Sequence, residues 1–196
     1  KKRCIIMVVC LFVLCAAAWM VFSGKESPSP SPALLEAAKG LDDYTITMKL
    51  VPSQHTLSIT EEIRLQNRTE DTLSSVVLRL WPNAYQTQDT SPAAADELFD
   101  LCYPNGFSSG SVLVHDVKWN GTAAEHAFLD AEKTVLSVNI GSWEKETEGV
   151  LYLRCVVQLP NCTHRTGYME NTYHLGNVLP LLSIYENGAW RQDAYS

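Results

Sequence analysis

Histidines are the residues of this chain best suited to binding a metal or moving a proton. The five are His55, His115, His126, His164 and His174. A zinc site of the His-Glu-x-x-His type needs a second His four residues after the first, and a Glu beside the first as general base. None of the five meets either condition. We therefore interpret them as surface or turn histidines, and we predict no metal site and no catalytic residue in this chain.

Hydroxyl and thiol nucleophiles give no stronger signal. The serines of residues 108–111 form a flexible turn rather than a Gly-x-Ser-x-Gly elbow. Three of the six cysteines lie within residues 4–22, where they behave as small hydrophobic side chains. The spacing of Cys102, Cys155 and Cys162 matches no zinc ribbon or finger. Cys155 and Cys162 could form a disulfide between a strand and the following loop, with free thiols as the alternative.

The charge balance excludes one class of partner. The chain has 15 Lys and Arg against 22 Asp and Glu, a net charge of -7. All three charges before residue 23 are basic, so the rest carries a net charge of -10. A chain this acidic lacks the basic footprint that binds phosphate backbones, so we expect no nucleic-acid partner.

The first residues predict a membrane segment. Lys1-Lys2-Arg3 precedes an uncharged stretch of 19 residues, Cys4–Phe22, long enough as a helix to cross a hydrocarbon core. A signal anchor spanning 1–22 fits this length, and a cleaved signal peptide is the alternative. The first predicts a single-pass membrane protein with its C-terminal portion extracytoplasmic, and the second a secreted one. Residues 23–43 are then a Ser/Pro-rich linker with a short helix at 34–41.

From Tyr44 onward the sequence predicts β-structure. Leu57, Ile59, Ile63 and Leu65 stand at alternate positions among polar residues, the period of a half-buried strand. Asn-Gly pairs at 120–121 and 187–188 predict tight turns. The expected strands are 44–51, 57–66, 76–80, 112–119, 127–129, 134–140, 150–159 and 179–185. Many short strands and no long amphipathic helix predict an all-β, antiparallel β-sandwich over 44–196.

Three stretches, in this order along the chain, carry a family resemblance. The first, 44–83, holds a Tyr-x-Ile-x-x-x-Leu strand and ends in Leu-Arg-Leu-Trp-Pro-Asn; the next, 106–121, ends in an Asn-Gly hairpin. The stretch 165–190 contains Arg-x-Gly-Tyr, then Leu-Gly-Asn-x-x-Pro, then Tyr-Glu-Asn-Gly-x-Trp. Together they resemble the N-terminal β-domain of the aminopeptidase N-like zinc metallopeptidases, in their bacterial membrane-anchored form.

The resemblance carries expectations about fold, cofactor and partners. It implies a saddle-like sandwich, truncated at its C-terminal end, that covers the cleft of a missing or separate catalytic domain. Zinc is expected in that domain, because this chain lacks His-Glu-x-x-His. The chain is then inactive alone, although it belongs to a peptide-hydrolysing parent. Its expected partners are that catalytic domain, peptide substrates, and a membrane through residues 4–22.

Two motifs near the end bear on substrate recognition. Family members place a Gln or Glu shortly before a Pro, directed at the amino terminus of the peptide. Matching that Pro to Pro180 puts Asn177 at the recognition position; a simple turn residue after Gly176 is the alternative. The letters Met169-Glu170-Asn171 echo a substrate-amine motif of the catalytic domain, but we interpret Glu170 as a solvated loop carboxylate.

Two other functions remain open from the sequence. One is a non-catalytic cell-surface binding module that keeps the β-sandwich without the protease. The other is an unrelated immunoglobulin-like or carbohydrate-binding sandwich.

Overall fold

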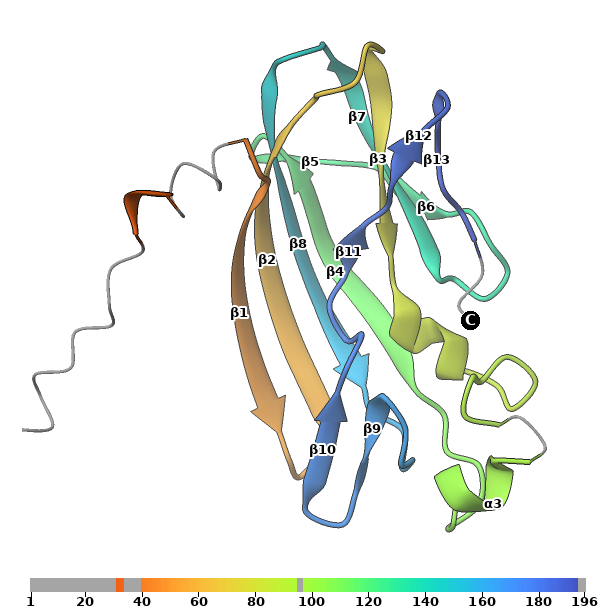
Figure 1. Cartoon of the computed structure of the whole chain (residues 1–196). Helices are drawn as coiled ribbons and strands as arrows, with labels where there is room; N and C mark the ends of the chain where they lie inside the picture. Colours follow the sequence, from red (N-terminus) through yellow and green to blue (C-terminus); the bar gives the residue numbers. More distant parts are fainter. Residues whose placement is uncertain (1–30, 34–39, 95–96, 194–196) are drawn as a thin grey trace, which may run out of the picture. The chain divides into compact units, whose positions relative to one another are not determined.

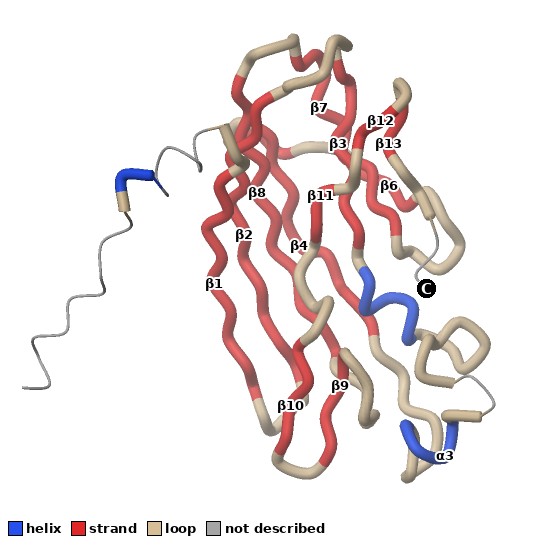
Figure 2. Tube along the Cα trace, viewed as in Figure 1, coloured by secondary structure: helices blue, strands red, loops and turns tan. Residues whose placement is uncertain are grey.

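The structure is a computed structural model, and it describes residues 31–33, 40–94 and 97–193. Residues from Asp42 onward belong to one compact unit, and almost all of its regular elements are antiparallel strands, which confirms the predicted all-β class (Figure 2). In chain order the elements are β1 (Asp43–Val51), β2 (Thr56–Gln66), β3 (Leu73–Arg79), η1 (Trp81–Tyr85), α3 (Phe99–Cys102), β4 (Ser111–Trp119), β5 (Thr122–Ala123), β6 (His126–Phe128), β7 (Val135–Trp143), β8 (Glu148–Gln158), β9 (Thr166–Met169), β10 (Thr172–Leu175), β11 (Leu181–Leu182), β12 (Tyr185–Glu186) and β13 (Ala189–Trp190).

Two antiparallel sheets form the body of this unit. One has five strands in the order β1-β2-β8-β4-β5, and the other has four in the order β11-β3-β7-β6. Two hairpins, β9–β10 and β12–β13, are attached to this body (Figure 1). The register between β2 and β8 is unbroken over the whole of β2, from Thr56 opposite Gln158 to Gln66 opposite Glu148.

One hydrophobic core joins the inner faces of both sheets. Strand β2 buries every second side chain, and Leu57, Ile59, Ile63 and Leu65 all lie in this core as predicted. Alternation of this kind is what a strand needs when one face is buried. The second sheet contributes residues of β3 and β7 to the same cluster.

The predicted turns are confirmed, whereas one predicted strand is not continuous. Asn120 and Asn187 have φ of 50° and 53°, each followed by a glycine with positive φ, as tight two-residue turns require. The predicted strand 179–185 is divided into β11 and the start of β12. Its apolar residues reflect passage over the core, because Val178 and Leu179 pack into the main cluster before β11 reaches the edge of β3.

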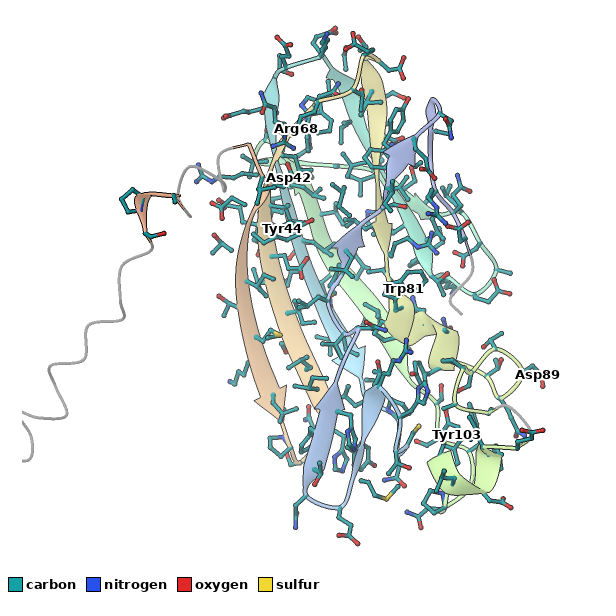
Figure 3. All side chains as sticks on the ribbon, in the orientation of Figure 1. Asp42, Tyr44, Arg68, Trp81, Asp89 and Tyr103 are labelled. Carbon is teal, nitrogen blue, oxygen red and sulfur yellow. The ribbon has the colours of Figure 1, made fainter. Side chains whose placement is uncertain are left out.

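A second, smaller cluster lies beneath the long connection from η1 to β4. Tyr85, Tyr103 and Cys162 are buried there, with Phe99 and Phe107 packed against them. Figure 3 shows Tyr103 beside α3, at the opposite end of this connection from Trp81. The helix α3 in this connection has only four residues.

The structure contradicts the predicted membrane localisation. Across residues 31–33, 40–94 and 97–193, no helix is both long and apolar enough to cross a bilayer. The predicted span, 4–22, lies outside the described residues, as does nearly all of the predicted helix at 34–41.

Candidate functional site

The turn of Leu175–Pro180, which carries the predicted recognition residue, is held by its own backbone. Gly176 donates its N–H to the carbonyl oxygen of Arg165 at 2.8 Å, and its own carbonyl accepts the hydroxyl of Thr166 at 2.6 Å. A Cβ at Gly176 would lie 2.9 Å from the Arg165 carbonyl oxygen, so this approach requires glycine. Asn177 follows with φ of 58°, a left-handed conformation that Asn tolerates better than most residues.

The residues after Asn177 are anchored in the main core. Val178 is buried, and Leu179 packs against the same cluster. The segment then crosses to the edge of the second sheet, where Leu181 and Leu182 pair with β3. Asn177 therefore stands at the start of the link between the β9–β10 hairpin and the second sheet, with its side chain half-buried.

The β9–β10 hairpin is attached to the turn between β1 and β2 by aromatic contacts. The ring of His55 stacks on Tyr168 with centroids 3.6 Å apart and an interplanar angle of 2°. The hydroxyl of Tyr173 lies 3.0 Å from His55 Nδ1 and donates to the carbonyl of Pro52 at 3.2 Å. These contacts fix the base from which the Asn177 turn departs.

Glu170 has the place expected for a solvated loop carboxylate. It is exposed in the turn between β9 and β10, with φ of 51°, and Met169 ends β9. The Met-Glu-Asn letters therefore lie on a hairpin tip, and the side chain of Glu170 faces solvent.

The histidines are dispersed over the fold. His115 and His126 are exposed on strands, whereas His55 and His164 are half-buried against tyrosines, more enclosed than the sequence predicted. Nδ1 of His164 lies 2.6 Å from the hydroxyl of Tyr85, and burial followed by the charge of Arg165 lowers the pKa of His164. Within the described part of the chain, no three His, Cys, Asp or Glu side chains form a group that could hold a metal ion.

The cysteines outside residues 4–22 are free thiols. Cys155 lies in the main core on β8, whereas Cys162 and Cys102 belong to the second cluster. The disulfide considered between Cys155 and Cys162 is therefore not formed in this structure. Burial raises the pKa of Cys155 to about 12 and that of Cys162 to about 11, which makes both thiols poor nucleophiles.

Sequence reasoning missed Glu61, although the pattern contained the signal. Glu61 occupies the middle of the alternating apolar positions of β2 and is paired with Ile46 on one side and Leu153 on the other. Its side chain is 0% exposed, and among the described residues its carboxyl oxygens have no hydrogen-bond partner. Burial raises the pKa of Glu61 to about 8. A charged residue in phase with a hydrophobic stripe is the feature that could have identified it.

Arg79 is a second buried charge that sequence reasoning missed. It ends β3 and is only 5% exposed. Its guanidinium carbon lies 4.3 Å from the ring centroid of Trp81, and Nη1 donates to the carbonyl of Arg191 at 3.2 Å. Nε and Nη2 have no partner within the described ranges.

Comparison with known proteins gives matches only among solved structures. No family model matches the chain, and no curated protein does. An M1 zinc metallopeptidase from Deinococcus radiodurans shares 16% sequence identity at a TM-score of 0.44, over 73% of this chain and 29% of that one. A mutant two-domain M1 zinc metallopeptidase bound to L-tryptophan shares 15% identity at a TM-score of 0.37, over 60% of this chain and 19% of that one.

The chain thus spans less than a third of each of these matched structures. Identity and similarity at this level do not assign the chain to a family.

Proposed function

We propose that this chain is the N-terminal, non-catalytic β-domain of an aminopeptidase N-like zinc metallopeptidase. In this proposal a separate catalytic domain holds the zinc and hydrolyses peptides. The saddle-like β-domain covers the cleft and helps to select free amino termini. The observation that carries the proposal is the Leu-Gly-Asn-x-x-Pro segment, because its residues build a fixed turn rather than a loose loop.

The role proposed for Asn177 follows from the chemistry of its side chain. An amide oxygen accepts hydrogen bonds, so it can bind the ammonium group at the start of a peptide. The backbone of the turn is fixed on both sides, by Gly176 before Asn177 and by the buried Val178 after it. Such pre-organisation limits the entropy lost when a ligand is bound.

The kinetic test uses the complete zinc peptidase in which the proposal places this chain. Asn177→Gly removes the amide but tolerates the φ of 58°. Loss of a hydrogen bond to a charged group should raise KM for peptides with a free amine by about tenfold or more. KM for N-acetylated peptides should not change.

A matched control is available in the same chain. Asn187→Gly makes the same chemical change at another left-handed position, φ 53°, in the exposed turn between β12 and β13. It should leave KM unchanged for both kinds of peptide. If Asn177→Gly and the parent have equal KM values for peptides with a free amine, Asn177 has no recognition role. A complete gene product without zinc-dependent peptide hydrolysis would instead favour the non-catalytic binding module.

A further inference from the structure

Arg79 is one of the residues that line a pocket formed where the segment 181–193 crosses the end of β3. Arg79 is opposite Leu181 in the register between β3 and β11. The carbonyl of Arg191 accepts both Nη1 of Arg79 and the hydroxyl of Ser183, which fixes the segment after β13 against β11. Trp81, labelled in Figure 3, begins η1 just after β3 and faces the guanidinium.

The pocket combines this cation with apolar walls. Its volume is about 180 Å³. Its lining residues are Arg79, Trp81, Leu181, Leu182, Ser183, Ile184, Arg191 and Asp193. Ile184 is 57% exposed and Leu181 is 39% exposed, so the apolar wall is open to solvent. A ligand that fits both features has a negative group and a hydrophobic body.

The two carboxylates whose charges act on Arg79, those of Asp193 and Asp130, have other partners. Oδ2 of Asp193 lies 2.7 Å from Nε of Arg191. The two carboxylate oxygens of Asp130 accept the backbone N–H groups of Thr134 and Val135 at 2.9 and 2.8 Å. Burial lowers the pKa of Arg79, and the charge of Arg191 lowers it further. The charges of the two carboxylates act at longer range and raise this pKa, but the net shift is downward. In residues 40–94 and 97–193, Nε and Nη2 of Arg79 have no acceptor.

We infer that this pocket binds the carboxylate of a small ligand or peptide end that carries an apolar side group. The planar guanidinium suits a bidentate carboxylate, and the ligand's side group would lie against Trp81, Leu181 and Ile184. Because Nε and Nη2 are covered, the guanidinium must turn toward the cavity and exchange the Arg191 carbonyl for the ligand. A carboxylate is favoured over a phosphate because Asp193 at the pocket would repel a doubly charged group.

The test is a titration of the full chain with N-acetyl-L-leucine, followed by NMR and calorimetry. The matched probe is N-acetyl-L-leucinamide, which replaces the carboxylate by a neutral amide. A ligand of this size should bind the parent chain with a Kd of roughly 1 mM. We expect shifts at Arg79 and Trp81 with the acid, and at least tenfold weaker binding of the amide. Equal binding of the two probes would overturn the inference.

Substitutions distinguish ligand binding in the pocket from non-specific attraction between the ligand and surface charges. Arg79→Met should weaken binding of the acid about tenfold or more, and Arg79→Lys, which keeps the charge but lacks the planar fork, should weaken it less. The control is Arg154→Met, an exposed arginine on β8 whose Nε donates to Asp116 at 2.7 Å. A similar loss for Arg154→Met would indicate general charge attraction and overturn the site.

Asp193→Asn gives a test that does not disturb the buried arginine. Asp193 is exposed, and its carboxylate competes for the same positive region. Its removal should tighten binding several-fold if the pocket receives an external carboxylate. Unchanged or weaker binding would mean that the carboxylate of Asp193 does not compete with the ligand for this pocket, and the inference would fail.

The source of the carboxylate is distinguished by a second pair of probes. A tripeptide ending in leucine is compared with the same peptide amidated at its C-terminus. If the tripeptide binds more tightly than N-acetyl-L-leucine, and amidation removes that binding, the natural ligand is a peptide end. If the tripeptide is excluded while N-acetyl-L-leucine binds, the pocket serves a free small carboxylate. Binding of neither acid contradicts the site.

Discussion

Glu61 in the main core and Arg79 at the end of β3 are both buried charged residues, but their surroundings differ. Glu61 is enclosed by strands on both sides, with Ile46 and Leu153 as its register partners. Arg79 lies in the wall of an open pocket, under the face of Trp81. A carboxyl can escape the cost of burial by taking up a proton, whereas a guanidinium keeps its charge in proteins.

This difference separates a buried titratable group from a residue that lines a proposed binding site. The pKa of Glu61 rises to about 8 because burial disfavours its charged form, so at neutral pH the folded chain holds this side chain largely neutral. Arg79 cannot become neutral in the same way, so its buried positive charge requires a negatively charged partner. The pocket beside it gives such a partner room to enter.

The largest expected effect comes from Glu61→Gln. In the parent chain the pKa of Glu61 is about 8 in the folded state, whereas in the unfolded state it is near the ordinary pKa of a glutamate, 4.5. Stability therefore falls as pH rises through this window, by about 4 kcal/mol between pH 5 and pH 9. Glutamine has no such titration, so the free energy of unfolding of Glu61→Gln should not show this fall. Urea denaturation at several pH values measures the difference.

The control for Glu61→Gln is the next residue along β2. Glu62 faces the other side of the strand, with a side chain 44% exposed and a weak contact to Arg64. Glu62→Gln should leave the pH profile of the parent unchanged. If Glu61→Gln loses stability between pH 5 and pH 9 as steeply as the parent, the carboxyl of Glu61 is not the group that titrates.

The sequence predicted the strand faces better than the buried charges. The alternation of Leu57, Ile59, Ile63 and Leu65 determines which side of β2 faces the core, because a strand has a period of two. The same alternation contains Glu61, so its burial was open to prediction. The burial of Arg79 was not, because the segment that covers it comes 112 residues later, at Arg191. Only the tertiary crossing of β11 and the segment after β13 over β3 creates that pocket.

Asn67 is a third buried polar residue, and its side chain, unlike those of Glu61 and Arg79, has hydrogen-bond partners for both its nitrogen and its oxygen. It is 1% exposed, and its Nδ2 donates to the carbonyls of Asp71 and Trp143, both at 2.8 Å. Its Oδ1 accepts the backbone N–H and the hydroxyl of Thr69 at 3.0 and 2.7 Å. Asn67→Ala should therefore lower the free energy of unfolding by about 2 to 3 kcal/mol, because buried groups are left without partners.

The control for Asn67→Ala is an exposed amide. Asn105 donates to Asn161 Oδ1 at 2.9 Å in an exposed position, where water can replace the lost bond. Asn105→Ala should change the free energy of unfolding by less than about 0.5 kcal/mol. Equal losses for the two variants would show that the Asn67 network contributes no more than a surface contact.

The smallest expected effect is that of Arg79→Met on stability. Methionine removes the cost of the buried charge, but it also removes the stacking on Trp81 and the bond to the Arg191 carbonyl. These changes oppose one another, so the free energy of unfolding should shift by about 1 kcal/mol or less, equally at pH 5 and pH 9. A loss of more than about 3 kcal/mol would mean that the guanidinium has a firm internal partner in solution, because breaking a buried ion pair costs that much. Arg79 would then belong to a structural ion pair rather than to a binding site. Like Asn67, it would be a buried polar residue whose partners lie within the fold.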